Sequence, residues 1–189
     1  GSLKLSETVP EMLSAGSFGY DKLGEKYDFF KYGAPNGKGV ILSRYWSYTG
    51  ITGMYFPFWC EANVNIDIPK ISIPVTAAHE LAHTKGFARE DEANFIAFLA
   101  CAESDNPEIR YSGYYLAIRY FMDIIGEYNT EATDKLYYEA YEVIQTEVVE
   151  TAEYYSEKEG EVMAVSSAVN DSFIKAQGVP EGTVSYSKM

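Results

Sequence analysis

The two histidines of this chain lie four residues apart, in the segment His79-Glu80-Leu81-Ala82-His83. On a helix, this spacing places both imidazole rings on one face about one turn apart, with the Glu80 carboxylate beside them. Two imidazoles so placed can provide two of the four ligands of a tetrahedral zinc ion, and a neighbouring glutamate can serve as a general base. The pattern is typical of a zinc hydrolase; the alternative is a pair of core histidines next to a solvated glutamate.

The residues around this motif predict the elements that must position it. Pro74 suits the first turn of a helix and Gly86 suits a left-handed cap, so we expect a helix from about Pro74 to Lys85. A second helix is expected from about Arg89 to Glu103, beginning with the acidic run Glu90-Asp91-Glu92 and becoming apolar thereafter. Carboxylates that lead into a buried helix need partners, and a metal ion would be one.

The third zinc ligand distinguishes two branches of zinc peptidases. A metzincin would have a third histidine at position 89, but this chain has Arg89, which stays protonated and cannot bind zinc. The segment Glu90 to Asn94 instead resembles the Glu-x-x-Ala-Asp motif of the prenyl-protein and heat-shock membrane proteases, which are gluzincins. The resemblance implies that Glu90 is the third ligand and that Asn94, in place of an aspartate, orients His79. Glu92 is the alternative ligand, because sequence defines helix phase poorly near a helix start.

The resemblance extends beyond the metal motif to a whole family. The stretches that carry it are Tyr55 to Phe58, Glu61 to Asn65, Thr76 to Ala100 and Arg110 to Tyr114. They resemble an uncharacterised bacterial family of HExxH peptidases that are expected to be membrane-anchored, with transmembrane helices ahead of a domain like this one. The resemblance covers most of residues 40 to 189. It implies a zincin-like fold, bound Zn²⁺, hydrolysis of peptide bonds with Glu80 as the base, and an extracytoplasmic domain anchored through a segment outside this sequence.

Residues that bind the substrate are predicted by analogy with other zincins. These enzymes commonly bind a peptide as an added strand along an edge strand above the metal. The segment Trp59 to Asp67 precedes the metal helix and is the candidate for that edge; an ordinary strand of a small sheet is the alternative. The candidate residues on it are Glu61, Asn63 and Asn65.

A tyrosine is the expected group for stabilising the oxyanion of the transition state, because no third histidine is present. Tyr111 and Tyr114 are the candidates for this role. With 17 tyrosines in the chain, each of the two is also a candidate for an ordinary core or rim aromatic residue.

The sequence pattern as a whole predicts one α+β domain over residues 1–189 that is predominantly helical and zincin-like. Gly1 and Ser2 have the composition of a scar left by tag removal. Residues 3–35 predict one or two short helices, and residues 39–67 predict a small sheet or extended region before the metal helix. Further helices are expected from Asp105-Asn106-Pro107 to about Gly126, from Thr130 to Glu157, and from Gly160 to about Gly178.

Composition narrows the range of partners. The net charge of −13 argues against nucleic acid and against anionic membrane surfaces, and leaves peptide or protein substrates open. Cys60 and Cys101 are expected to be buried free thiols, with a single disulfide as the alternative. A zinc metalloendopeptidase is the leading hypothesis. A catalytically inactive zinc-binding sensor or interaction domain is the second, and a metal-free helical interaction protein is the third.

Overall fold

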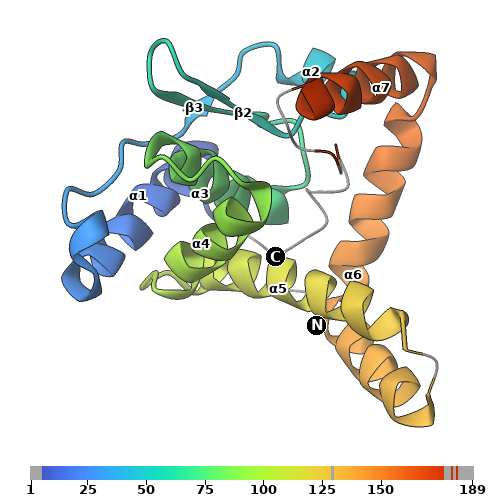
Figure 1. Ribbon diagram of the computed structural model, residues 1–189. Coiled ribbons are helices and arrows are strands. Elements are labelled where there is room, and N and C mark those ends of the chain that lie inside the picture. Colours follow the sequence, from blue (N-terminus) through green and yellow to red (C-terminus); the bar gives the residue numbers. More distant parts are fainter. Residues whose placement is uncertain (1–5, 129, 177–179, 181, 183–189) are drawn as a thin grey trace.

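The computed structural model describes residues 6–128, 130–176, 180 and 182, and shows the expected predominantly helical α+β architecture (Figure 1). The helices are α1 (Val9–Lys26), α2 (Ser43–Thr49), α3 (Ile73–Thr84), α4 (Glu90–Ala102), α5 (Pro107–Gly126), α6 (Glu131–Lys158) and α7 (Glu161–Ala176). The strands are β1 (Lys38–Gly39), β2 (Gly53–Phe56) and β3 (Glu61–Val64), and the 3-10 turns are η1 (Asp28–Phe30) and η2 (Lys70–Ser72).

Helix α3, which carries the HELAH motif, lies between the sheet and helices α4 and α5 (Figure 1). It packs against α1, α4 and α5 and against strands β2 and β3. Small residues allow these neighbours to approach closely, since Ala77, Ala78 and Ala82 are fully buried. Burial on so many sides holds α3, and with it His79 and His83, in a fixed position.

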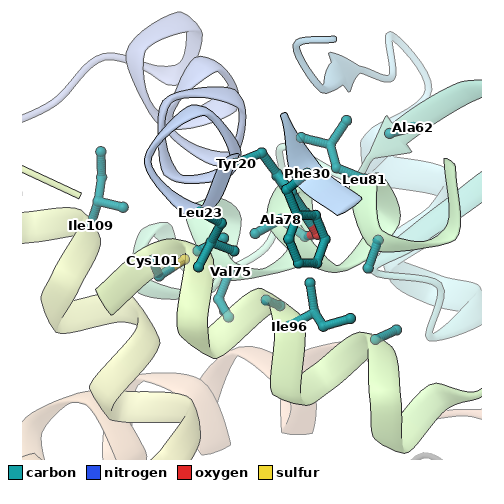
Figure 2. Packing of buried hydrophobic residues seen from close by; sticks show 14 residues of the cluster. Tyr20, Leu23, Phe30, Ala62, Val75, Ala78, Leu81, Ile96, Cys101 and Ile109 are labelled. Carbon is teal, nitrogen blue, oxygen red and sulfur yellow. The ribbon is translucent and has the colours of Figure 1, made fainter. Parts of the chain in front are cut away.

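The main core cluster joins α1, α3 and α4, as Figure 2 shows. Tyr20 and Leu23 of α1 meet Ala78 and Leu81 of α3, and Ile96 of α4 packs against the same cluster. The Tyr20 hydroxyl is also satisfied within this core, because it donates a hydrogen bond of 2.8 Å to the Ala78 carbonyl. The apolar contacts and this hydrogen bond together fix α3 against α1.

The sheet has the strand order β1-β3-β2, so β3 is its central strand. It pairs in parallel with β1 and antiparallel with β2. The prediction that Trp59 to Asp67 forms a substrate-binding edge is therefore wrong, because both sides of β3 are already occupied. Strand β2 lies at the edge instead. The local sequence predicts extended structure in this region, but the order of the strands depends on contacts between distant segments.

Helix α1 corrects the expectation of one or two short helices between residues 3 and 35. It is a single helix whose start is fixed by Thr8 and Glu11, which form a reciprocal capping box. Its internal glycines lie where α1 crosses its neighbours. A Cβ atom on Gly19 would stand 2.6 Å from the Ala100 carbonyl carbon, and one on Gly16 would stand 2.8 Å from a methyl group of Leu81. These glycines therefore permit close helix contact; they do not break the helix.

The helices after the HELAH motif begin and end close to the predicted positions. Asn106 caps α5 by accepting a hydrogen bond from the Glu108 amide, and Thr130 caps α6 in the same way from Thr133. Helix α6 runs along the outside of the molecule from α5 to α7 (Figure 1). The predicted end of the last helix near Gly178 lies outside the described residues. None of the helices in the described part of the chain has the length and apolar character needed to cross a membrane.

Two features of residues 39–67 differ from the prediction. Helix α2 interrupts the expected sheet region, because the aromatic residues of Ser43–Thr49 form a short helix that ends at the left-handed Gly50. Cys60 is also exposed, in the turn between β2 and β3, although we expected a buried thiol. Cys101 is buried as expected, and both cysteines are free thiols.

Candidate functional site

His79 and His83 of α3 and Glu90 at the start of α4 bring three potential metal-ligand atoms together. The Nε2 atom of His79 is 3.1 Å from Nε2 of His83 and 3.0 Å from Oε2 of Glu90, and Nε2 of His83 is 3.7 Å from Oε1 of Glu90. Ligands held at about 2.0–2.1 Å around a tetrahedral zinc ion lie about 3.3 Å from one another. The three residues therefore have the separation that zinc requires. Within the described residues, this is the one such cluster.

The short connection between α3 and α4 places Glu90 beside the histidines. Gly86 takes a φ of 94°, a left-handed conformation that favours glycine, and the chain reverses there into α4. Phe87 of the same turn accepts a hydrogen bond of 2.7 Å from His83 Nδ1 through its carbonyl. Because a carbonyl can only accept, Nδ1 carries a proton, which leaves Nε2 as the atom of His83 that can bind a metal when the ring is neutral.

The Glu90 carboxylate is largely buried and incompletely satisfied. Its Oε2 atom lies close to His79 but lacks a hydrogen-bond partner of adequate geometry. Burial opposes ionisation of this group, but the two imidazoles outweigh that effect and lower the pKa of Glu90 to about 2. A buried carboxylate oxygen without a partner is costly. A cation between the three side chains would satisfy it, so the residues present fit a metal ion.

Glu80 is buried beside the cluster, with 6% of its surface exposed. Burial raises the pKa of its carboxyl group above the ordinary value, although the amide of Tyr55 donates a hydrogen bond to it and both imidazoles oppose the rise. Strand β2 passes directly over this carboxylate. A Cβ atom on Gly53 would stand 2.7 Å from Glu80 Cγ and closer still to Oε1. Only glycine leaves room for the Glu80 side chain in its present position.

Tyr55 is a site residue for which sequence reasoning assigned no role. Its ring lies over that of His83, with the ring planes inclined at 29° and the centroids 6.4 Å apart, and its amide contacts Glu80. Its hydroxyl lies 3.7 Å from the Cys60 sulfur at the end of the hairpin. The signal that could have indicated this strand is Gly53, because a glycine inside a strand often marks a close approach of the backbone to another group.

The structure brings Glu90 to the histidines and leaves Glu92 outside. The Glu92 side chain is 51% exposed and lies 3.8 Å from Arg89, which also pairs with Asp91 at 2.6 Å. Glu92 and Asp91 therefore face solvent and Arg89. The role of Glu90 as a metal ligand stays a prediction, but its position is the one that the role requires.

Asn94 is buried one turn after Glu90, a position that agrees with the predicted role of orienting His79. Its Nδ2 donates a hydrogen bond of 2.6 Å to the Tyr120 hydroxyl on α5. Tyr120 is itself partly buried, and mainly for that reason its pKa rises to about 12. A bond from Asn94 to His79 stays a prediction. The observed bond ties the start of α4, and hence Glu90, to α5.

The structure does not bring Tyr111 or Tyr114 to the cluster. Tyr111 faces α6, where burial and a hydrogen bond with Glu147 raise its pKa. Tyr114 is about half exposed and packs edge-on against Phe98. Neither residue has a described contact with the triad. The described contacts of the two side chains, with α6 and with Phe98, give the predicted oxyanion role no support.

The predicted edge residues Glu61, Asn63 and Asn65 also lie away from the cluster. Ala62 and Val64 of β3 are buried in the core, so strand alternation turns Glu61 and Asn63 to the opposite, outer face of the sheet. There, Glu61 pairs with Lys38. Asn65 is fully buried and donates a hydrogen bond of 2.9 Å to the Ile51 carbonyl, which is a structural role.

The fold and the site together define a helical α+β domain with a His-His-Glu cluster and a buried glutamate beside it. The chain belongs to the family described as "Protein of unknown function (DUF3810)", which matches residues 2–189. Neither the curated proteins nor the solved structures contain a significant match to it. The matched region includes β2, α3 and α4, and so contains every residue of the candidate site.

Proposed function

We propose that this protein is a zinc-dependent metallopeptidase of gluzincin type with a zincin-like domain. The observation that supports the proposal is the convergence of His79, His83 and Glu90, with the Glu80 carboxylate buried beside them. Two imidazoles and one carboxylate are a common ligand set of catalytic zinc, which keeps a further position open for water or substrate. Cys60 is exposed and Cys101 lies in the core, so neither belongs to the described cluster as an additional ligand.

Each residue of the site would have a defined part in hydrolysis. Zinc held by the triad would supply Lewis acidity, which lowers the pKa of water and polarises a peptide carbonyl. Glu80 accepts a proton from the attacking water and returns it to the leaving amine. Its raised pKa suits this double role, and the Tyr55 amide lies beside its carboxylate. Phe87 holds the His83 ring in the tautomer that can bind a metal.

The open edge of β2 is the proposed binding site for the substrate backbone. In an antiparallel pair, residues that exchange hydrogen bonds alternate with residues whose peptide groups point away. Thr52 accepts a hydrogen bond of 2.8 Å from Asn65, so the next hydrogen-bonded position along β2 is Met54. Gly53 and Tyr55 then direct their peptide groups to the open edge.

The hydrogen bond between the Tyr55 amide and Glu80 agrees with this register. An extended peptide paired with the edge of β2 would therefore run past Glu80 and the histidines. This assignment replaces the segment Trp59 to Asp67 as the substrate edge. It leaves the expectation of a peptide or protein substrate unchanged.

The substitution Glu80→Gln tests the proposal. We expect the variant to retain about one zinc per chain, because Glu80 is not a ligand, and to lose at least about a hundredfold in cleavage of unfolded protein substrates. Metal analysis and a protease assay measure the two properties, and Glu92→Gln is the matched control that should keep both. Full cleavage by Glu80→Gln would exclude its role as the base.

The other hypotheses predict different outcomes for the unmodified protein. Zinc bound without cleavage of any peptide would favour an inactive zinc-binding domain. Protein that stays free of zinc despite supplementation would favour a metal-free helical interaction protein.

A further inference from the structure

We infer that the site selects extended peptides with apolar side chains at two positions separated by one residue, which bind beside Met54 and Phe56 on the outer face of the sheet. The inference rests on the proposed function, because it takes the open edge of β2 as the strand that pairs with the peptide.

The two faces of β2 have different surroundings. Tyr55 stacks on His83 and Gly53 lies against Glu80, so both belong to the inner face that meets α3. Successive side chains of a strand point to opposite faces, which places Met54 and Phe56 on the outer face. Residues opposite one another on neighbouring strands point to the same face. A peptide residue opposite Tyr55 would therefore face the metal cluster, and the residues on either side of it would face outwards.

The outer face of the sheet beside these side chains carries a shallow apolar groove that extends from β2 across β3. The groove has a volume of about 540 Å³ and is lined by Val40, Trp46, Met54, Phe56 and Trp59, with Glu61 and Asn63 between them. The rings of Phe56 and Trp59 stack with centroids 4.8 Å apart and form one wall of the groove. Met54 is 41% exposed and Trp59 is 68% exposed, so apolar surface remains in water on this face. Apolar peptide side chains would remove that surface from water.

The charges around the groove also favour an apolar peptide. Glu61 pairs with Lys38 across β1 and β3, so the charged residue in the groove is already neutralised. The chain as a whole carries a net charge of −13, which disfavours acidic peptides. The groove is also continuous with the strand that lies over Glu80, since Met54 and Phe56 belong to both. An extended peptide is thus the occupant that matches both the edge and the face.

Two synthetic peptides of the same composition test the inference. In one, leucine and serine alternate; in the other, the leucines stand in adjacent pairs. Only the alternating peptide presents leucine at both outward positions, so it should bind about tenfold more tightly to the zinc-supplemented Glu80→Gln protein. Fluorescence anisotropy of labelled peptides measures the affinities, and the inactive variant keeps both peptides intact during the measurement.

A second substitution links the preference to the groove. Met54→Gln, made in the Glu80→Gln protein, keeps the length of the side chain. It should reduce the difference in affinity between the two peptides. Leu136→Gln is the matched control, because Leu136 is similarly exposed, at 45%, but lies on α6. It should leave the difference unchanged. The inference is supported if Met54→Gln loses the preference for the alternating peptide and Leu136→Gln keeps it.

The inference would be overturned by any of three results: equal affinities for the two peptides, no binding of either peptide, or an equal effect of both substitutions. The proposed function is judged separately, by zinc-dependent cleavage of a random peptide mixture by the unmodified protein. Cleavage without the alternating preference would overturn only the present inference.

Discussion

Glu80 and His83 each lie beside a main-chain group. The Tyr55 amide donates to the Glu80 carboxylate, and the Phe87 carbonyl accepts from the His83 ring. Main-chain contacts depend on where the strand and the turn run, because every residue type other than proline offers the same amide and carbonyl. The geometry of the site at this scale is therefore sensitive to substitutions that move the backbone of β2 or crowd the space beneath it.

Gly53→Ala should impair catalysis while leaving the metal in place. The added methyl group would stand 2.7 Å from Glu80 Cγ, so the carboxylate must move. We expect a loss of about a hundredfold in kcat/KM, since a displacement of about 1 Å in a catalytic group can have that effect. Zinc content should stay the same. Gly160→Ala, where nothing lies within 4 Å of the new methyl, is the control. Unchanged kcat/KM in the Gly53 variant would show that Glu80 need not occupy its present position.

Glu90→Gln should weaken zinc binding far more than Glu92→Gln. Glu90 lies 3.0 Å from His79, whereas Glu92 is half exposed and near Arg89. Removal of a ligand carboxylate should lower zinc affinity by at least about a hundredfold, the upper range for residues that only support a ligand. Competition with a chromogenic chelator measures the affinity. The reverse order of the two variants would transfer the ligand role to Glu92.

The sequence predicts the side chains of the site better than their partners. His79, Glu80 and His83 follow from a spacing of four on one helix. Glu90 is predicted from the resemblance of the segment Glu90 to Asn94 to the Glu-x-x-Ala-Asp motif, with Glu92 as the alternative. Tyr55 and Gly53 contact the site through a peptide group and through the absence of a side chain. The peptide-group contact gives no recognisable pattern in a single sequence, and Gly53 gives only the general signal of a glycine inside a strand.

At the scale of elements, three segments assemble the site around α3. The hairpin of β2 and β3 covers one side of α3, α4 begins beside its C-terminal turn, and α1 supports it from behind (Figure 1). Close packing of α1 depends on its glycines, because a Cβ atom on Gly19 would stand 2.6 Å from the Ala100 carbonyl carbon. Ala100 belongs to α4, so this contact helps to set the position of α4 and thus of Glu90.

Gly19→Ala should therefore destabilise the protein. Overpacking of a close contact typically costs about 1–3 kcal/mol, and a contact this short with backbone atoms places the cost in the upper part of that range, above the gain in helix propensity of about 1 kcal/mol. Urea denaturation measures the free energy of unfolding. Gly126→Ala in α5 is the matched control: its new methyl would have only an ordinary contact at 3.9 Å from Tyr137, so it should be neutral or slightly stabilising. Equal effects of the two substitutions would contradict the packing argument.

Elements with local signals are predicted well, and those set by distant contacts are not. The starts of α5 and α6 follow from the caps Asn106 and Thr130, whose partners lie within three residues. The glycines of α1 have the same local signature as loop residues, although their function is to contact Ala78 and Ala100. The central position of β3 depends likewise on pairing with β1, more than twenty residues earlier in the chain.

At the scale of the whole molecule, the charge of the chain affects how metal binding must be tested. The chain has 28 acidic and 15 basic residues, so any divalent cation can stabilise it weakly by reducing repulsion among carboxylates. A cation bound at the triad acts differently. It would link α3 to α4, and so hold together two of the helices that form the main core.

Zinc should therefore stabilise the protein far more than an equal concentration of magnesium. A ligand that binds only the folded state at about a hundredfold above its Kd adds about 2.7 kcal/mol, which for a domain of this size raises Tm by roughly 5–10 °C. Magnesium prefers oxygen ligands and should report only the general charge effect. Calorimetry of the unmodified protein and of His83→Ala, with each metal in turn, separates the two contributions. If His83→Ala kept the zinc-specific rise in Tm, the ion would have to bind elsewhere on the acidic surface, and the triad would not be the metal site.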